Sequence, residues 1–230
     1  MDQGGDRKQA LIEAVRILAR ERLSGARAAA ALPFIDYFFG HVAPRDMVDE
    51  DPEDLFGAAI ALWQFGAERS PETAKIRAYQ PSFESDGWRS PRAVIEIVND
   101  DMPFLVDSVT TALGEMDLAA HLVIHPIVPL RRAEGAVTVA APDDGQARAE
   151  SFMHIQISAP AGTTDMAAVE ARLTAVLADV RAAVTDWRAM RAKMQELATE
   201  TAEHPPKVAG LKSADISEIA AFLGWLADDH

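Results

Sequence analysis

The stretch VIEIVNDDMPFLVDSV, residues 94–109, predicts a strand that turns directly into a helix. In the strand part, residues alternate between two faces. One face is entirely apolar and includes Ile95 and Ile97, and the other is apolar except at Glu96. Because both faces can be buried, we expect a central strand that is covered on both sides.

The second half of this stretch indicates the start of a helix. Asp100 and Asp101 are acidic residues that can accept hydrogen bonds from unpaired backbone N–H groups, and Pro103 is tolerated in a first helical turn. Apolar residues then recur at helical spacing, namely Phe104, Leu105, Val109, Ala112, Leu113 and Met116. We therefore expect an acid-capped helix that ends near Asp117.

On the N-terminal side, residues 1–73 read as a helical segment. One apolar stripe runs through residues 7–32 and predicts a first helix, which Leu32–Pro33 interrupts. A short aromatic-rich helix is expected over residues 34–41. A third helix should begin at Pro52, because proline and acidic residues favour a first turn.

On the C-terminal side, the pattern predicts an α/β unit over residues 74–203. Alternating or β-branched runs indicate strands at residues 75–80, 121–132, 137–140 and 150–159. A long apolar stripe predicts a helix from Thr164 or Asp165 to about Leu197, and a last helix is expected within residues 204–230 from Ser213.

The order from residue 92 to residue 197 is thus βαββα, which is five of the six elements of a ferredoxin-like sandwich. Its last strand has no counterpart in that range. Three alternatives are open for this last strand: it is supplied by Lys75–Gln80, by a neighbouring subunit, or it is absent. The expected fold class is α+β, with an N-terminal helical unit, this sandwich and a C-terminal helix.

Composition excludes several kinds of site. The chain has 230 residues, no cysteine and a formal net charge of −14. Disulfides, thiolate metal sites and cysteine nucleophiles are therefore excluded, and a nucleic acid or an anionic membrane would be repelled. Arg131–Arg132 is a pair, and the other basic residues are scattered along the sequence. The polar N-terminus and the lack of a long apolar run lead us to expect a soluble, cytoplasmic protein.

Several long runs carry a resemblance to a known family. They are DPEDLFGAAIALWQF, AKIRAYQP, DGWRSP, VIEIVNDDMPFLVDSVT, HLVIHPIVPLRR, ESFMHIQI and FLGWLADDH, in this order. From about Leu11 onward, the chain resembles the N-terminal region of the large bacterial NAD-specific glutamate dehydrogenases. That resemblance implies a helical segment, an ACT-like regulatory domain and a catalytic domain much further along the chain, so we expect the present sequence to be a fragment.

The same resemblance implies what the parent enzyme does. It would convert L-glutamate, water and NAD⁺ to 2-oxoglutarate, ammonia and NADH, as a homo-oligomer. For this chain, the remainder of the parent chain is the expected partner, and no cofactor is expected. The sequence has no GxGxxG motif after a strand. None of its lysines stands in an apolar context that would suit catalysis; these are Lys8, Lys75, Lys193, Lys207 and Lys212.

The resemblance also suggests where an effector would bind. An ACT domain holds its effector at the loop between the first strand and the first helix, where free N–H groups can bind a carboxylate. The candidate effector-binding or interface residues are Asn99, Asp100, Asp101, Met102, Pro103, Phe104, Asp107 and His125. The loop lacks the usual glycine, and its acids would repel a carboxylate but could meet an ammonium group. We therefore weigh two roles, namely an assembly surface and a sensor of a small amino acid.

Other polar residues have simpler explanations. His121 and His125 lie on one strand about 13 Å apart, which is too far to share a metal ion, and His154 comes from another strand. We expect these histidines to be packed and hydrogen-bonded. Asp100, Asp101 and Asp107 suit capping and solvated positions better than acid–base catalysis.

Overall fold

The computed structural model describes residues 3–47, 49–133, 136–141, 143–159, 164–205 and 208–228. The chain divides into two compact units, Met1–Ala178 and Asp179–His230. The elements are α1 (Gln3–Arg22), α2 (Gly25–Gly40), η1 (Pro44–Asp46), α3 (Pro52–Ala67), β1 (Lys75–Tyr79), α4 (Phe83–Asp86), β2 (Ala93–Asp100), α5 (Leu105–Glu115), β3 (Ala120–Ile124), β4 (Ile127–Ala133), β5 (Ala136–Val139), β6 (Arg148–Ile157), α6 (Met166–Glu203) and α7 (Ser213–Ala227).

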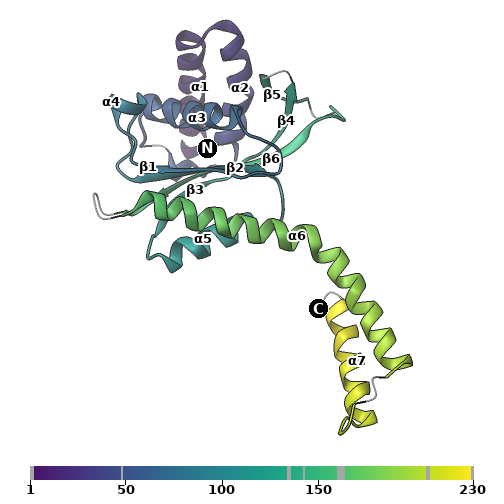
Figure 1. Ribbon diagram of the computed structural model, residues 1–230. Coiled ribbons are helices and arrows are strands. Elements are labelled where there is room, and N and C mark those ends of the chain that lie inside the picture. The colour runs from purple at the N-terminus through teal and green to yellow at the C-terminus, as the bar shows by residue number, and fades with distance from the viewer. Residues whose placement is uncertain are drawn as a thin grey trace. The chain divides into compact units, whose positions relative to one another are not determined.

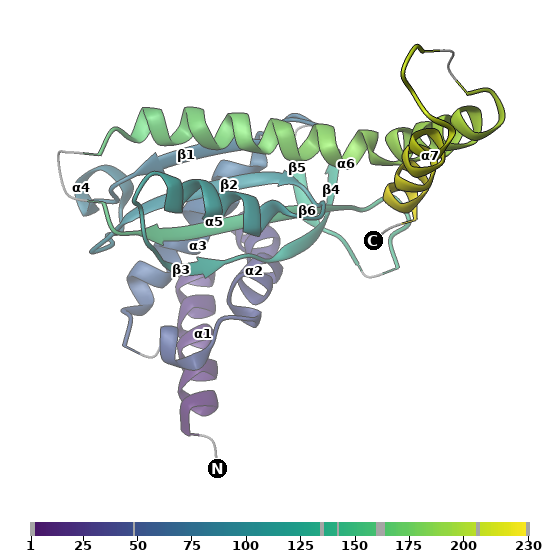
Figure 2. The ribbon, with the colours of Figure 1, turned by 90° about the horizontal axis from the view of Figure 1, so that it is seen from below.

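The first unit consists of three layers. A sheet lies in the middle, helices α1, α2 and α3 cover one face, and α5 with the beginning of α6 covers the other (Figures 1 and 2). Strand β2 is buried along almost its whole length, from Ala93 to Asn99. The prediction of a central strand covered on both sides is therefore confirmed, and the chain is of the α+β class.

All strand pairs in the sheet are antiparallel. The strand order is β1-β2-β6-β4-β5, and β3 pairs with β6. The segment that we expected at Lys75–Gln80 is β1, which pairs with β2 along its length. Residues 75–79 thus form an outer strand of the sheet, which comes from the N-terminal side of β2 in the sequence.

The strand that we expected over residues 121–132 is two strands. Both pair with β6, and the register is the same on either side of the gap, with Ile124 opposite His154 and Ile127 opposite Ser151. Pro126 lies in the gap, where it lacks an N–H for the ladder but still accepts a hydrogen bond from the N–H of Phe152. The break is therefore local, and β3 and β4 lie one after the other along the same neighbour.

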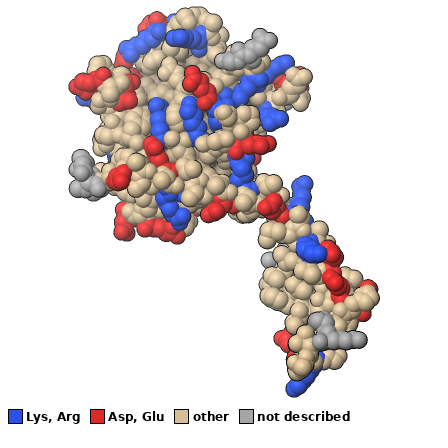
Figure 3. Space-filling view, in the orientation of Figure 1, with Lys and Arg blue, Asp and Glu red and all other residues tan. Residues whose placement is uncertain are grey.

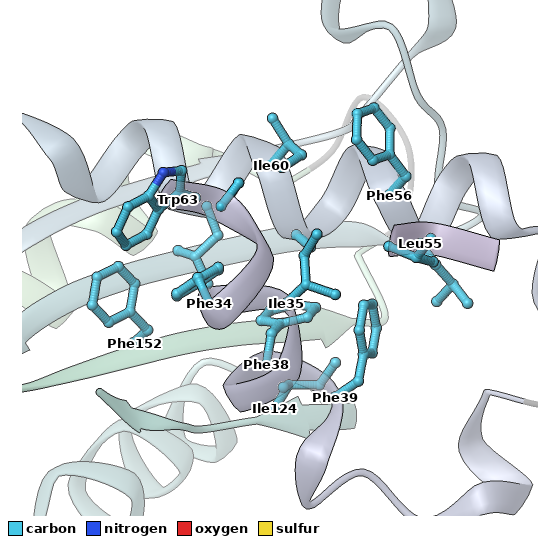
Figure 4. Close-up of a cluster of buried hydrophobic side chains, with 14 of the residues drawn as sticks. Phe34, Ile35, Phe38, Phe39, Leu55, Phe56, Ile60, Trp63, Ile124 and Phe152 are labelled. Carbon is cyan, nitrogen blue, oxygen red and sulfur yellow. The ribbon is translucent and has the colours of Figure 1, made fainter. Parts of the chain in front are cut away.

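The main hydrophobic core joins the helical segment to the sheet. Phe34 of α2 packs against Trp63 of α3 and against Phe152 of β6, each with ring centroids 5.0 Å apart (Figure 4). Phe38 and Phe39 are also fully buried in this cluster. The aromatic-rich run that we placed in a short helix thus forms the contact between helices and sheet.

The predicted helix break at Leu32–Pro33 is wrong. The break lies at Leu23–Ser24, and Pro33 is inside α2. Proline cannot donate a hydrogen bond to the carbonyl four residues earlier, which here belongs to Ala29. Both Pro33 and Ala29 are exposed, so water can satisfy that carbonyl, and the helix continues because its next turn buries Phe34 and Ile35.

The second unit contains the C-terminal part of α6 and helix α7. The guanidinium of Arg191 donates a hydrogen bond of 2.7 Å to the carbonyl of Ala227 and joins the two helices. Several large apolar side chains are exposed on this unit, including Met190, Phe222 and Trp225. Among the described helices, none combines the length and the apolar character that a membrane span requires.

Candidate functional site

The loop between β2 and α5 follows a different course from the one we expected. Helix α5 begins at Leu105, and Phe104 occupies the N-cap position in a left-handed conformation with φ 69°. No side chain caps this end. The predicted acidic cap is therefore wrong, because Asp100 still belongs to β2 and the chain uses the next four residues to turn.

Phe104 is unusual in two respects. A left-handed backbone costs a non-glycine residue on the order of 1–2 kcal/mol, since Cβ approaches the following carbonyl. The side chain is 67% exposed, so burial of the ring does not offset that cost within this chain. Strain of this kind is characteristic of functional positions.

Six of the eight candidate residues line one hollow beside this loop. They are Asp101, Met102, Pro103, Phe104, Asp107 and His125, and the hollow has a volume of about 440 Å³. Leu105, Val106 and Ile127 complete its lining. The structure therefore brings His125, from the gap between β3 and β4, to the loop that precedes α5.

His125 is a hydrogen-bonded residue in this hollow. Its Nε2 atom lies 2.6 Å from the hydroxyl of Ser151. Burial lowers the pKa of His125, and the negative charge of Asp101 opposes that shift only in part. The imidazole is therefore neutral near pH 7.

The other two histidines have separate surroundings. His121 is hydrogen-bonded to Ser158, and His154 is buried between Phe38 and Trp88. Among the residues that the structure describes, no group of three or more His, Cys, Asp or Glu side chains is placed to hold a metal ion.

Asn99 and Asp100 lie outside the loop hollow. Asn99 is fully buried in β2, where it pairs with Ser151 of β6. The carboxylate of Asp100 accepts a hydrogen bond of 2.6 Å from Arg69 and another of 3.1 Å from the backbone N–H of Glu72. Asp100 therefore links the segment after α3 to the end of β2 through these two hydrogen bonds.

Asp100 belongs to a buried charge cluster that sequence reasoning missed. Glu150 accepts hydrogen bonds from Arg69 (2.9 Å) and, through both of its oxygens, from Arg132 (2.7 and 2.9 Å). The side chains of Arg69 and Glu150 are each only 3% exposed. The four charged groups thus join the segment after α3 to β2, β4 and β6 at one end of the sheet.

The pKa values within this cluster reflect competing effects. Burial by itself would raise the pKa of Glu150, but the hydrogen bonds from Arg132 and Arg69 outweigh it and lower the pKa. Burial would likewise lower the pKa of Arg69, and its bonds to Glu150 and Asp100 reverse the direction. Glu150 and Arg69 are therefore both charged at neutral pH.

Comparisons with known proteins place the chain in a family. The family model described as glutamate dehydrogenase, ACT1 domain, matches residues 34–173, which is more than half of the chain. An NAD-specific glutamate dehydrogenase of Halomonas elongata is 31% identical over 224 residues, and one of Pseudomonas aeruginosa is 29% identical over 201 residues. An enzyme of the same name from Mycobacterium tuberculosis is 28% identical over 186 residues.

These matches cover most of this chain but only a small part of each relative. They include 96%, 86% and 78% of this chain, but only 14%, 12% and 11% of the respective relatives. The chain thus spans between about a ninth and a seventh of the length of these curated relatives. It belongs to the ACT1-domain family of glutamate dehydrogenases.

Proposed function

We propose that this chain is the non-catalytic N-terminal region of a large NAD-dependent glutamate dehydrogenase, and that it serves regulation and assembly. The parent protein would bind NAD and oxidise L-glutamate in the cytoplasm, using residues elsewhere in its sequence. The family match and the small share of the relatives that the chain covers support this proposal. The observation that carries the assembly role is the difference between the two edges of the sheet.

Strand β1 forms an edge that the chain itself covers. The carboxylate of Glu170 in α6 accepts a hydrogen bond of 2.7 Å from the backbone N–H of Ala78. An unpaired N–H on an edge strand is a template for another chain, and a side-chain acceptor blocks it. Strand β1 is therefore protected against pairing.

For β3, no side chain among the described residues accepts a hydrogen bond from the strand edge in this way. Among the strands that the structure describes, it pairs only with β6. Val123 and Ile127 fall on the face of the sheet that also carries α5, and both are exposed. Ile127 shares the loop hollow with Phe104. An open strand edge flanked by exposed apolar side chains is suited to association with another subunit.

Sedimentation velocity of the purified chain tests this role. We expect a concentration-dependent dimer, and we expect Val123→Lys to make it monomeric, because a charge on an edge strand opposes strand pairing. Phe83→Lys is the control, since Phe83 is also an exposed apolar residue but lies on α4, away from this edge. A wild-type chain that stays monomeric at its highest soluble concentration would contradict assembly through this edge.

A second candidate function is the sensing of a small amino acid in the loop hollow. The acidic residues Asp101 and Asp107, which both line it, favour this reading because they could bind an ammonium group. Thermal unfolding with a panel of amino acids should then show stabilisation that Asp101→Asn removes.

Production of NADH from glutamate by the isolated chain would overturn the non-catalytic assignment.

A further inference from the structure

We propose that the chain has an anion-binding site at the buried charge cluster, which takes a small molecule carrying two negative charges as carboxylates or phosphate. A hollow of about 370 Å³ opens there. Its charged lining consists of four arginines and two acids, namely Arg69, Arg131, Arg132, Arg148, Asp100 and Glu150. Figure 3 shows blue side chains gathered over the corner formed by β4 and β5.

This concentration of positive charge results from the fold. The chain as a whole carries a net charge of −14, and its arginines look scattered in the sequence. Strand pairing places Arg148 of β6 opposite Leu130 of β4, next to Arg131 and Arg132. Arg69 lies in the segment after α3 and reaches the same place by binding Glu150. The residues that line the hollow thus carry an excess of two positive charges, although the chain as a whole is acidic.

The charged groups at the floor of the hollow are bonded to one another and to the backbone. Arg132 binds Glu150 and also donates hydrogen bonds of 2.7 and 2.8 Å to the carbonyls of Gly66 and Ala67 at the end of α3. Arg69 binds Glu150 and Asp100. Two arginines and two carboxylates therefore neutralise one another in fixed positions, and this floor is preorganised without attracting further anions strongly.

The arginines that the two acids of the floor do not neutralise lie at the rim. The side chain of Arg148 is exposed and forms no hydrogen bond or ion pair with any residue that the structure describes. Arg131 donates to the amide oxygen of Gln146 and lies 3.6 Å from a carboxylate oxygen of Asp144, which is a loose ion pair. Guanidinium groups present paired donors that match the geometry of carboxylates and phosphates. Two such groups above a neutral floor suit a dianion better than a monoanion.

This site is separate from the loop hollow, and it does not depend on the regulatory role proposed above. The two hollows have no lining residue in common, although Asp100 lines one and Asp101 lines the other. Binding at the arginines can therefore be measured independently of any effector at the loop.

Titration calorimetry of the 230-residue chain tests the proposal at constant ionic strength. The probes are inorganic phosphate and glutarate, with acetate and glutaramide as the monoanionic and uncharged comparisons. We expect saturable binding of phosphate, glutarate or both, at least tenfold tighter than that of acetate. The dianion that binds more tightly shows whether the site prefers phosphate or carboxylate groups.

Two double variants with the same change in charge complete the test. Arg131→Gln with Arg148→Gln should weaken binding of the dianion at least tenfold and leave the unfolding temperature nearly unchanged, because both side chains lie at the rim. Arg89→Gln with Arg172→Gln removes two exposed arginines elsewhere and should leave binding unchanged. The proposal is overturned by the absence of saturable binding, by equal weakening in both variants, or by binding that survives the rim substitutions.

Discussion

Arg132 binds Glu150 through two parallel hydrogen bonds, from Nε to Oε1 at 2.7 Å and from Nη2 to Oε2 at 2.9 Å. The same guanidinium reaches the carbonyls of Gly66 and Ala67. One side chain therefore connects β4, β6 and the C-terminal end of α3. Since Glu150 is also bound by Arg69, removing its charge leaves two arginines without their shared counter-ion.

Glu150→Gln should destabilise the protein strongly. Breaking a buried ion pair from one side costs about 3–5 kcal/mol, because the remaining charge stays buried without compensation. Urea unfolding measures this loss of free energy. Glu115→Gln is the control, since its ion pair with Arg172 is exposed and should contribute less than about 1 kcal/mol. Equal losses in the two variants would contradict the assigned role of the cluster.

The contribution of Glu150 should also depend on pH. Its pKa in the folded protein lies below the ordinary value of 4.5, so the unfolded state binds the proton more tightly. The stabilisation is therefore complete above pH 4.5 and is lost as the pH falls through the folded pKa. Urea unfolding at a series of pH values should show the difference between wild type and Glu150→Gln shrinking below about pH 4.5. A difference that is constant down to acid pH would exclude this linkage.

Gly57→Ala should disturb the packing of α3 against Trp88. A Cβ atom at position 57 would lie 2.1 Å from Cβ of Trp88, whose side chain is almost fully buried. Overpacking of this kind costs about 1–3 kcal/mol, so we expect a lower unfolding temperature. Gly114→Ala in α5 meets no atom within 4 Å and should instead stabilise the protein by about 0.5–1 kcal/mol. Calorimetric melting of both variants distinguishes the two effects.

Phe104→Gly should stabilise the isolated chain. Glycine adopts a positive φ without the steric cost, and the exposed ring contributes little burial, so a gain of up to about 1 kcal/mol is expected. Phe104→Ala keeps the strained backbone and should give no gain. Chemical denaturation of both variants tests this, and a stabilised glycine variant that no longer associates would link the strained residue to assembly.

Glu170→Ala should open the protected edge of the sheet. It removes a hydrogen bond from a backbone N–H to a charged group, which contributes about 1.5–3 kcal/mol. Hydrogen exchange at the amide of Ala78 should accelerate, while amides of the central strand β2 keep their protection. Glu170→Gln retains an acceptor oxygen and should show a smaller effect. Unchanged exchange at Ala78 in the alanine variant would mean that the contact does not protect this edge.

Prediction from sequence succeeded where the pattern was local. Alternation over residues 93–99 identified the buried strand, and apolar stripes identified most helices. It failed at Pro33, where we let a local rule end a helix although burial of Phe34 and Ile35 continues it. It also failed at Phe104, because capping preferences do not reveal where a preceding strand stops.

By itself, the sequence determined the α+β class, the central strand and the resemblance to the glutamate dehydrogenase family, because these depend on periodicity and on long contiguous runs. Only the tertiary structure decided that Lys75–Tyr79 lies beside β2 and that Arg69, Arg132 and Glu150 meet. These residues are separated by up to 81 positions along the chain. Strand pairing between distant segments brings their charges together, and no local pattern encodes that proximity.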